Sequence, residues 1–364
     1  MFIEFNLENL EKSKEILENI LDENRKKIDE LLTIENKTYK NFVLPFQEIG
    51  ECINEFITPI FHIDSVKNSE ITTKVYEDCI PVISKYETDI SQNENIYIAL
   101  KDIQSNESIS LNDIQNKVLE NEIRDFKLSG CHLENNKKKR LEEISLRLSE
   151  LSHKFSQNLL NATNEFEMII DSFEDVKEIP ASDLELAKFE EDGITKYKFT
   201  LQMPSYMAYI TYGTSREKRE EIYKGYCTRA PQNGKIIEEL LALKNEKAKI
   251  IGFDSYAQYS LATKMASKEE DVITFLEELG YKAKARAKEE LEEIKQLALK
   301  DGITDFKSSD VSYYSEKLKK AQYDLDEEYY RPYFEQQSVL NGFFDFLHQM
   351  FNIKFTKAET PAWD

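Results

Sequence analysis

The stretch LEEISLRLSELSHKF, residues 141–155, decides the fold class. Its apolar residues recur at alternating intervals of three and four: Leu141, Ile144, Leu148, Leu151 and Phe155. This period places them on one stripe of an α-helix, and the alternation is typical of a seam between antiparallel helices. We therefore expect a long helix that packs along its length against antiparallel neighbours.

The composition extends this expectation to the whole chain. The 364 residues include only 10 Gly and 8 Pro, so long stretches contain no helix breaker. Hydrophobic residues make up 40% and aromatic residues 11%, too many for a disordered chain. Two more stripes with helical spacing appear early: Leu10, Ile16, Leu17, Ile20 and Leu21, then Phe42, Phe46, Ile49, Ile53, Phe56 and Ile57. No repeat of fixed period is present, so the sequence predicts an all-α, irregular multi-helix bundle rather than a solenoid.

One segment breaks the helical pattern. EFEMIID (residues 165–171) and LAKFEEDGITKYKFTLQM (residues 186–203) alternate polar with apolar residues, and Asp192-Gly193 is a two-residue hairpin turn. We expect a small β-hairpin near 186–202, with Tyr197, Phe199 and Leu201 on one face. The change in pattern predicts a helical region 1–164, a β insertion 165–205 and a second helical region 206–364.

Helices in the second half carry their own start and stop signals. Thr214 and Glu217 have the spacing of a capping box, and Gly252 and Asp301-Gly302 are expected to end helices. The last helix is expected to place one apolar set on a buried face: Val339, Leu340, Phe343, Leu347, Met350 and Phe351. FNIKF, residues 351–355, is expected to be a strand.

The net charge and the cysteines indicate which partners and which cellular location to expect. A net charge of −21 repels phosphate backbones and anionic lipid headgroups, so no nucleic-acid partner and no membrane partner are expected. The basic run Asn136–Arg140 is best explained as a solvated first turn of a helix. Four dispersed cysteines without a CxxC pair indicate reduced thiols, and the N-terminus does not resemble a signal peptide. A cytoplasmic location is expected.

Reaction machinery is missing from the sequence. It contains no GxGxxG, GxxxxGK[ST] or GxSxG motif, and the four histidines His62, His132, His153 and His348 are isolated. Cys131 and His132 are adjacent, which points their side chains in different directions. HQMFN at His348 resembles the start of HExxH, but Gln349 replaces the base and Asn352 replaces the second ligand. We therefore assign no catalytic and no metal-binding residue; the substrate-binding residues are unknown at this point.

Three blocks nevertheless carry a family resemblance. They occur in this order: YGTSREKREEIYKGYCTRAP (Tyr212–Pro231), LLALKNEKAKIIGFDSYAQYSLATKMA (Leu240–Ala266) and DVSYYSEKLKKAQYDLDEEYYRPYFE (Asp310–Glu335). Together they resemble the thimet oligopeptidase family of zinc metallopeptidases, in its bacterial oligopeptidase A branch. The resemblance covers residues 165–364 most clearly.

The resemblance implies a helical fold of two lobes that face each other across a narrow channel. Short peptides are cut there at a zinc ion held by HExxH and a glutamate from a later helix, with the motif glutamate as general base. Aromatic residues of the third block, Tyr313, Tyr314, Tyr329, Tyr330 and Phe334, then suit channel walls. None of the zinc or catalytic positions has a counterpart here, because the ending Ala362-Trp363-Asp364 precedes them in the family.

Two functional hypotheses follow. In the first, the chain is the N-terminal, non-catalytic part of a zinc oligopeptidase, interrupted at its C-terminal end; zinc belongs to the complete enzyme and no cofactor to this chain. Its partners are then short peptides in the complete enzyme, the missing C-terminal half, or a second copy of itself. In the second, the chain is a free-standing helical binding or scaffold protein derived from such an enzyme.

Overall fold

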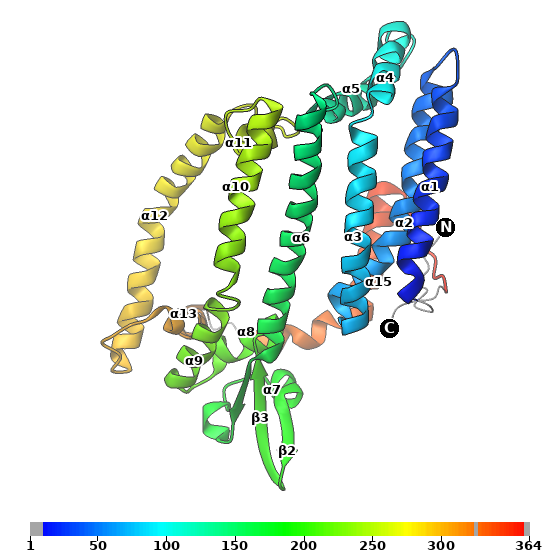
Figure 1. Cartoon of the computed structure of the whole chain (residues 1–364). Coiled ribbons are helices and arrows are strands. Elements are labelled where there is room, and N and C mark those ends of the chain that lie inside the picture. Colours follow the sequence, from blue (N-terminus) through cyan, green and yellow to red (C-terminus); the bar gives the residue numbers. More distant parts are fainter. Residues whose placement is uncertain (1–9, 324–326, 360–364) are drawn as a thin grey trace. The chain divides into compact units, whose positions relative to one another are not determined.

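The computed structural model describes residues 10–323 and 327–359, and it is predominantly α-helical with one small sheet, as expected (Figure 1). The helices are α1 Ser13–Leu32, α2 Leu44–Val66, α3 Glu70–Ser91, α4 Glu94–Glu107, α5 Asp113–Leu128, α6 Asn135–Glu165, α7 Ala181–Ala187, α8 Met203–Tyr212, α9 Arg216–Cys227, α10 Asn233–Ile251, α11 Tyr256–Leu261, α12 Glu269–Lys300, α13 Val311–Tyr323, α14 Glu327–Tyr330 and α15 Gln336–Phe351. The strands are β1 Glu167–Ile170, β2 Lys188–Glu191 and β3 Ile194–Thr200. No helix among the described residues is long and apolar enough to cross a membrane.

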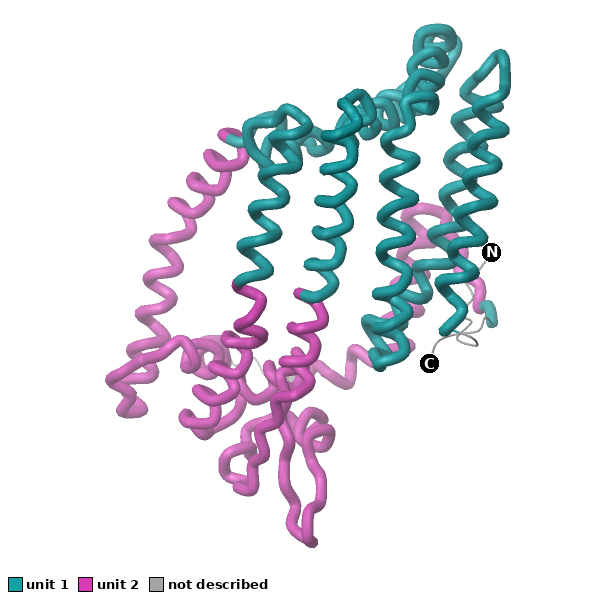
Figure 2. Tube along the Cα trace, in the orientation of Figure 1, with its two compact units in different colours: residues 1–154, 235–269, 358–364 teal, residues 155–234, 270–357 magenta. Residues whose placement is uncertain are grey.

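The chain forms two compact units, which are coloured separately in Figure 2. Unit 1 comprises residues 1–154, 235–269 and 358–364, and unit 2 comprises 155–234 and 270–357. Helices α6 and α10 contribute residues to both units. The three regions predicted from the sequence, with boundaries at residues 164 and 205, rest on changes of sequence pattern along the chain. These boundaries stay a prediction.

Unit 1 begins with three mutually packed helices, α1, α2 and α3. The expected stripe of α1 supplies Leu17 and Leu21, which are buried against Ile57 of α2 and Cys79 of α3, whereas Ile16 is exposed. A second core forms where α4 and α5 pack together. The two cores contain most of the two apolar stripes expected in the first 60 residues.

The seam predicted for residues 141–155 is confirmed. Leu141, Ile144 and Leu151 of α6 are buried. On one side Ser149 accepts a 3.3 Å hydrogen bond from the hydroxyl of Ser84 on α3. On the other side α6 faces α10 through two bidentate ion pairs, whose residues run in opposite order along the two helices: Arg140 with Glu246, and Arg147 with Glu239. Helix α6 therefore has an antiparallel neighbour in α10 (Figure 1).

The other local signals of unit 1 also match the structure. Helix α10 ends at Ile251, and Gly252 follows in the left-handed region with φ of 107°. The backbone N–H of Phe253 donates to the carbonyl of Ala248, as in a Schellman motif. The basic run at residues 136–140 is the mostly exposed first part of α6. All four cysteines are free thiols.

Unit 2 contains the predicted hairpin. Strands β2 and β3 pair antiparallel with Glu191 opposite Ile194, and the turn residues Asp192 and Gly193 have φ of 52° and 77°. The three residues expected on one face, Tyr197, Phe199 and Leu201, are all buried. The segment at 165–171 adds β1 on the other edge of β3, giving a three-stranded sheet in the order β1-β3-β2.

The start signal predicted for α9 is wrong by one residue. The N-cap is Ser215, whose hydroxyl accepts from the backbone N–H of Lys218, so Glu217 is not the third helical residue. The hydroxyl of Thr214 instead donates to the carbonyl of Glu174, 2.6 Å away. A tertiary contact thus occupies the hydroxyl that the local pattern assigned to the cap. The stop predicted after α12 is confirmed, with Gly302 at φ of 83°.

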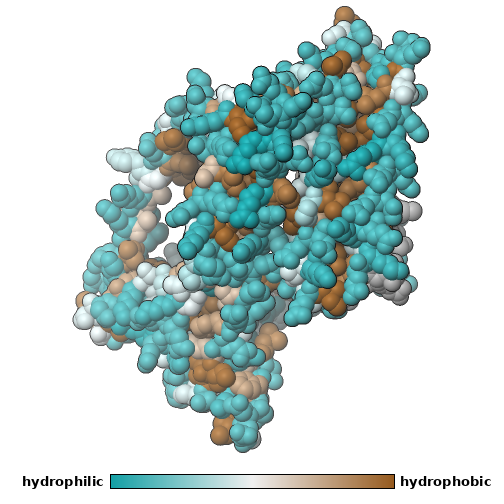
Figure 3. Space-filling view, in the orientation of Figure 1, coloured by the Kyte–Doolittle hydropathy of each residue, from teal (hydrophilic) through white to brown (hydrophobic). Residues whose placement is uncertain are grey.

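The buried face predicted for the last helix is also wrong. Helix α15 has no buried residue, and its apolar side chains are exposed by 38% to 63%: Val339, Leu340, Phe343, Phe346, Met350 and Phe351. The period identified the apolar stripe, but the described residues of unit 2 do not cover it. Residues 352–359 contain no strand, so the expectation for FNIKF fails as well; Phe355 instead stacks on Phe344 with ring centroids 4.5 Å apart. On the face drawn in Figure 3 the surface is mostly hydrophilic, with apolar residues scattered among the polar ones.

Candidate functional site

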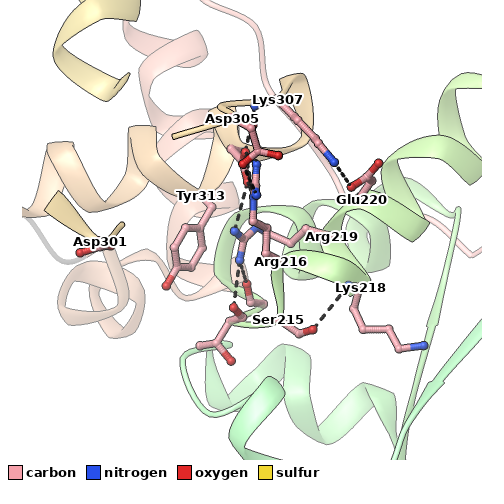
Figure 4. Close-up of polar contacts among 12 residues, drawn as sticks. Ser215, Arg216, Lys218, Arg219, Glu220, Asp301, Asp305, Lys307 and Tyr313 are labelled. Carbon is pink, nitrogen blue, oxygen red and sulfur yellow. Dashed lines mark hydrogen bonds and ion pairs between the residues drawn. The ribbon is translucent and has the colours of Figure 1, made fainter. Parts of the chain in front are cut away.

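A buried carboxylate in unit 2 joins two of the sequence blocks that carried the resemblance. Asp310 directly precedes α13 and is completely buried. Arg216, in the first turn of α9, donates to both of its oxygens at 2.9–3.2 Å and reaches Asp305 at 2.7 Å. Figure 4 shows the arginines of α9 directed at the segment that carries Asp305 and Lys307. The carboxylate thus fixes α9 against the start of α13.

Arg219 is the second cation at this carboxylate, and only 2% of it is exposed. Its guanidinium lies 3.4 Å from Asp310, donates to the carbonyl of Gly213 at 2.8 Å, and stacks over the Tyr313 ring at 4.0 Å. Its Nε has no hydrogen-bond partner among the described residues. A planar guanidinium suits this position because it donates and stacks at the same time.

The electrostatics of this cluster oppose proton transfer. Burial alone would raise the pKa of Asp310, but hydrogen bonds from Arg216 and from the backbone of Lys307 outweigh it and lower that pKa. At the exposed edge, Lys224 and Lys307 lower the pKa of Glu220 to about 2. Carboxylates held this firmly in the ionised form make poor general acids or bases near neutral pH. The cluster is therefore a structural link rather than a reaction centre.

An open pocket of about 690 Å³ lies close to this cluster in unit 2. Its apolar lining includes Pro204, Met207 and Phe334, and its charged lining includes Asp183, Glu316 and Arg331. One carboxylate oxygen of Glu316 pairs with Lys319 at 2.7 Å, and the other has no hydrogen-bond partner among the described residues. Apolar walls with a few charges of both signs suit the binding of a ligand rather than its chemical conversion.

The structure explains why His348 cannot begin a zinc-binding helix. A second ligand four residues later must lie on the same helix face. Here α15 ends at Phe351, and Asn352 is its left-handed C-cap with φ of 55°. The backbone N–H of Asn352 donates to the carbonyl of His348 and ends the helix one residue before that position. His348 itself is exposed.

The remaining histidines are equally separate. Cys131 is buried and His132 is exposed, so the two side chains point in different directions as expected. His153 is buried on α6, where it stacks on Tyr76 with ring centroids 4.2 Å apart. Within residues 10–323 and 327–359, no group of three or more His, Cys, Asp or Glu side chains is arranged to hold a metal ion. The absence of catalytic and metal residues from this chain stays a prediction.

The aromatic residues suggested as channel walls divide into two classes. Tyr313 and Tyr314 are buried, while Tyr329, Tyr330 and Phe334 are 66%, 45% and 70% exposed. No local pattern in the sequence predicts the contact between Arg219 and Asp310, because 91 residues separate them. Their positions inside two blocks of the resemblance are the only clue that the sequence offers.

Comparison with known proteins places both halves of the chain in one family. Residues 17–138 match the model of the neurolysin/thimet oligopeptidase N-terminal domain, and residues 209–363 match that of peptidase family M3. Oligopeptidase A of Haemophilus influenzae is 38% identical over 93% of this chain and 52% of its own length. Oligopeptidase A of Escherichia coli is 35% identical over 87% of this chain and 48% of its own length. An organellar oligopeptidase A of Arabidopsis thaliana is 31% identical over 93% of this chain and 45% of its own length.

The chain therefore spans about half the length of the curated relatives it matches. Both family models and the oligopeptidase A relatives indicate the same family as the three sequence blocks. The chain belongs to the thimet oligopeptidase family, peptidase family M3, in its oligopeptidase A branch.

Proposed function

We propose that this chain supplies the non-catalytic, channel-forming part of a zinc peptidase that hydrolyses short peptides. The metal site and the reacting groups belong, in this proposal, to segments that correspond to the other half of the oligopeptidase A relatives. The chain by itself then binds no zinc and cuts no peptide. The short peptides, the cytoplasmic location and the lack of nucleic-acid or membrane partners are part of the same proposal.

The exposed face of α15 carries the proposal. Phe343, Phe346 and Met350 are each more than half exposed on a helix of 16 residues. Apolar faces of this extent on a folded chain mark surfaces that another chain or segment covers. Since the chain spans about half of its relatives, segments equivalent to the rest of those relatives are the natural cover.

The residues present do not fit the zinc ion that the family resemblance implies for the complete enzyme. Zinc in a peptidase needs three protein ligands and an open position. His348 has no second histidine on its helix, because Asn352 is the C-cap. No other suitable group of ligands occurs in the described part of the chain. We therefore derive no catalytic step from these residues.

The pocket of about 690 Å³ in unit 2 is consistent with a role in holding peptide. Its apolar lining suits side chains, and charges of both signs suit the polar groups of an extended backbone. Substrate handling without bond cleavage is what a channel wall contributes, because alignment over a reaction centre is itself a large part of catalysis.

The proposal is tested on the purified chain alone. Metal analysis after dialysis and cleavage of a quenched fluorescent peptide are expected to give no bound zinc and no cleavage. Stoichiometric zinc together with chelator-sensitive cleavage would overturn the proposal. Capture of one specific folded protein, with no response to the complementary half of a relative, favours the scaffold alternative.

A further inference from the structure

A small polar pocket in unit 1 lies among α3, α6 and α10 and measures about 280 Å³. Helix α6 contacts α3 through Ser84 and Ser149 and contacts α10 through Arg147 and Glu239. Six hydroxyl-bearing residues contribute to the pocket lining: Ser84, Thr88, Ser91, Ser129, Ser145 and Ser149. A lining this rich in oxygen atoms favours a small polar ligand.

The hydroxyl groups present mainly acceptor atoms to the pocket. Thr88 donates its hydroxyl proton to the carbonyl of Ser84 at 2.8 Å, and Ser149 donates to the carbonyl of Ser145 at 3.1 Å. Ser129 likewise donates to the carbonyl of Asp125 at 2.9 Å. A hydroxyl that donates to its own helix can still accept through its oxygen, and in Ser149 one acceptor position is already taken by the hydroxyl of Ser84. These walls therefore suit a ligand group that donates several hydrogen bonds.

The rest of the lining consists of Gln92, Leu141 and two side chains of opposite charge. The Gln92 amide donates to the carbonyls of Ser129 and Lys138 at 3.4 Å. Glu87 of α3 and Lys247 of α10 have no hydrogen bond or ion pair with any described residue. The Lys247 ammonium lies 5.5 Å from the centroid of the Tyr259 ring. Burial raises the pKa of Glu87 and lowers the pKa of Lys247, and no nearby charge offsets either shift. Glu87 is still open to solvent, as a side chain at the mouth of a concave site can be.

Two nearby lysines, in contrast, are paired. The neighbouring Lys85 pairs with Glu142, and Lys138 pairs with Glu94 at 2.6 Å. Lys247 is half-buried, and the loss of water around an ammonium group without a carboxylate partner costs free energy that a ligand carboxylate recovers. Glu87 is exposed and offers its carboxylate to a ligand cation at the mouth of the pocket. Because the pocket holds one carboxylate and one ammonium, a simple anion is repelled by the first and a metal cation by the second.

We propose that this pocket binds an α-amino acid unit, with its ammonium group at Glu87 and its carboxylate or carbonyl oxygen at Lys247. The hydroxyl oxygens of α3 and α6 accept the remaining ammonium protons. The unit is either a free amino acid or the N-terminal residue of a short peptide, since both present the same adjacent groups. This inference rests on the residues of unit 1 alone and is independent of the proposed function.

Titration calorimetry with the full chain tests the ligand chemistry. Alanine and alanyl-alanine present the ammonium group, whereas lactate carries a hydroxyl in its place. We expect alanine or alanyl-alanine to bind and lactate to bind at least tenfold more weakly. Binding by alanine alone assigns the free amino acid, and binding by the dipeptide alone assigns the peptide N-terminus. Failure of both to bind, or equal binding by lactate, overturns the inference.

Variants test the two charged residues. Lys247→Met and Glu87→Gln are each expected to weaken binding at least tenfold. Lys244→Met is the matched control, because Lys244 lies three residues earlier on α10 and also faces a tyrosine ring, Tyr256, without lining the pocket. Unchanged binding in both pocket variants contradicts the inference.

A labelling measurement on the unaltered chain does not depend on the folding of any variant. Peptide mapping after reaction with an amine reagent gives the modification rate of each lysine. Saturating alanine or alanyl-alanine, whichever binds, is expected to slow the reaction of Lys247 several-fold and to leave that of Lys244 unchanged. Equal rates at Lys247 with and without the ligand contradict the assignment.

Discussion

Arg219 and Asp310 lie 3.4 Å apart, and only 2% and 0% of their side chains are exposed. A buried ion pair of this kind adds little net stability by itself, but removal of one partner leaves the other charge desolvated and unpaired. Two sequence blocks about 90 residues apart therefore depend on each other in unit 2.

Asp310→Asn is expected to lower the free energy of unfolding by about 3 kcal/mol, because Arg219 loses its only carboxylate partner among the described residues. Urea denaturation followed by circular dichroism measures the change. Asp301→Asn is the control, since Asp301 pairs with Lys317 at an exposed position and its loss is largely screened by solvent. Equal effects of the two substitutions contradict the structural role given to Asp310.

His153 is expected to make unit 1 less stable in mild acid. Burial lowers its pKa below the ordinary 6.5, and this outweighs the opposite effect of Asp64 and Glu77. The folded state then binds fewer protons than the unfolded state between the two pKa values, so stability is fully present above pH 6.5 and falls as the pH drops below it. The loss reaches at most about 1.4 kcal/mol at pH 5.5, one pKa unit below the unfolded value.

The variant His153→Phe keeps a ring to stack on Tyr76 and removes the titration. Nε2 of His153 has no hydrogen-bond partner among the described residues, and its 3.8 Å contact with Glu77 is an ion pair only when the ring is protonated. The variant therefore loses no bond that the neutral ring makes at this atom. Urea midpoints at pH 7.5 and pH 5.5 are compared for both proteins. We expect the unaltered chain to lose more stability over this interval than the variant. An equal loss in both rules out this titration as the cause.

The exposed face of α15 is expected to drive self-association of the isolated chain. Phe343→Asp places a charge on a face where the side chain is 52% exposed, so it disrupts association without opening a core. Multi-angle light scattering is expected to show oligomers of the unaltered chain and a smaller mass for the variant. Ile109→Asp, at a fully exposed apolar residue of unit 1, serves as the control and leaves the mass unchanged. A monomeric unaltered chain contradicts the prediction.

The sequence predicted the features that depend on near neighbours along the chain. The α6 stripe, the Asp192-Gly193 turn and the helix stops at Gly252 and Gly302 follow from period or from left-handed backbone geometry, and all are confirmed. Features decided by distant residues were missed. Thr214 and Ser215 are both competent caps, and the carbonyl of Glu174, 40 residues away, decides between them.

The error at α15 has a related physical cause. A period of 3.6 residues shows that a helix has an apolar face but not what covers it. The pairing of Arg219 with Asp310 and the pocket with Glu87 and Lys247 are also invisible locally, because each is assembled from separate helices. Charged residues at helical spacing have the same pattern whether they face water or a pocket.

The most direct test of the account is complementation. The chain is co-expressed with the half of Haemophilus influenzae oligopeptidase A that it does not match, and cleavage of a short fluorogenic peptide is measured with and without a zinc chelator. Each half alone serves as the control, and the unaltered chain is compared with Phe343→Asp. We expect chelator-sensitive cleavage only from the pair, and less of it with the variant. Co-purified halves that cleave no peptide, or cleavage by this chain alone, would contradict the claim that it provides the wall and not the metal site of a peptidase.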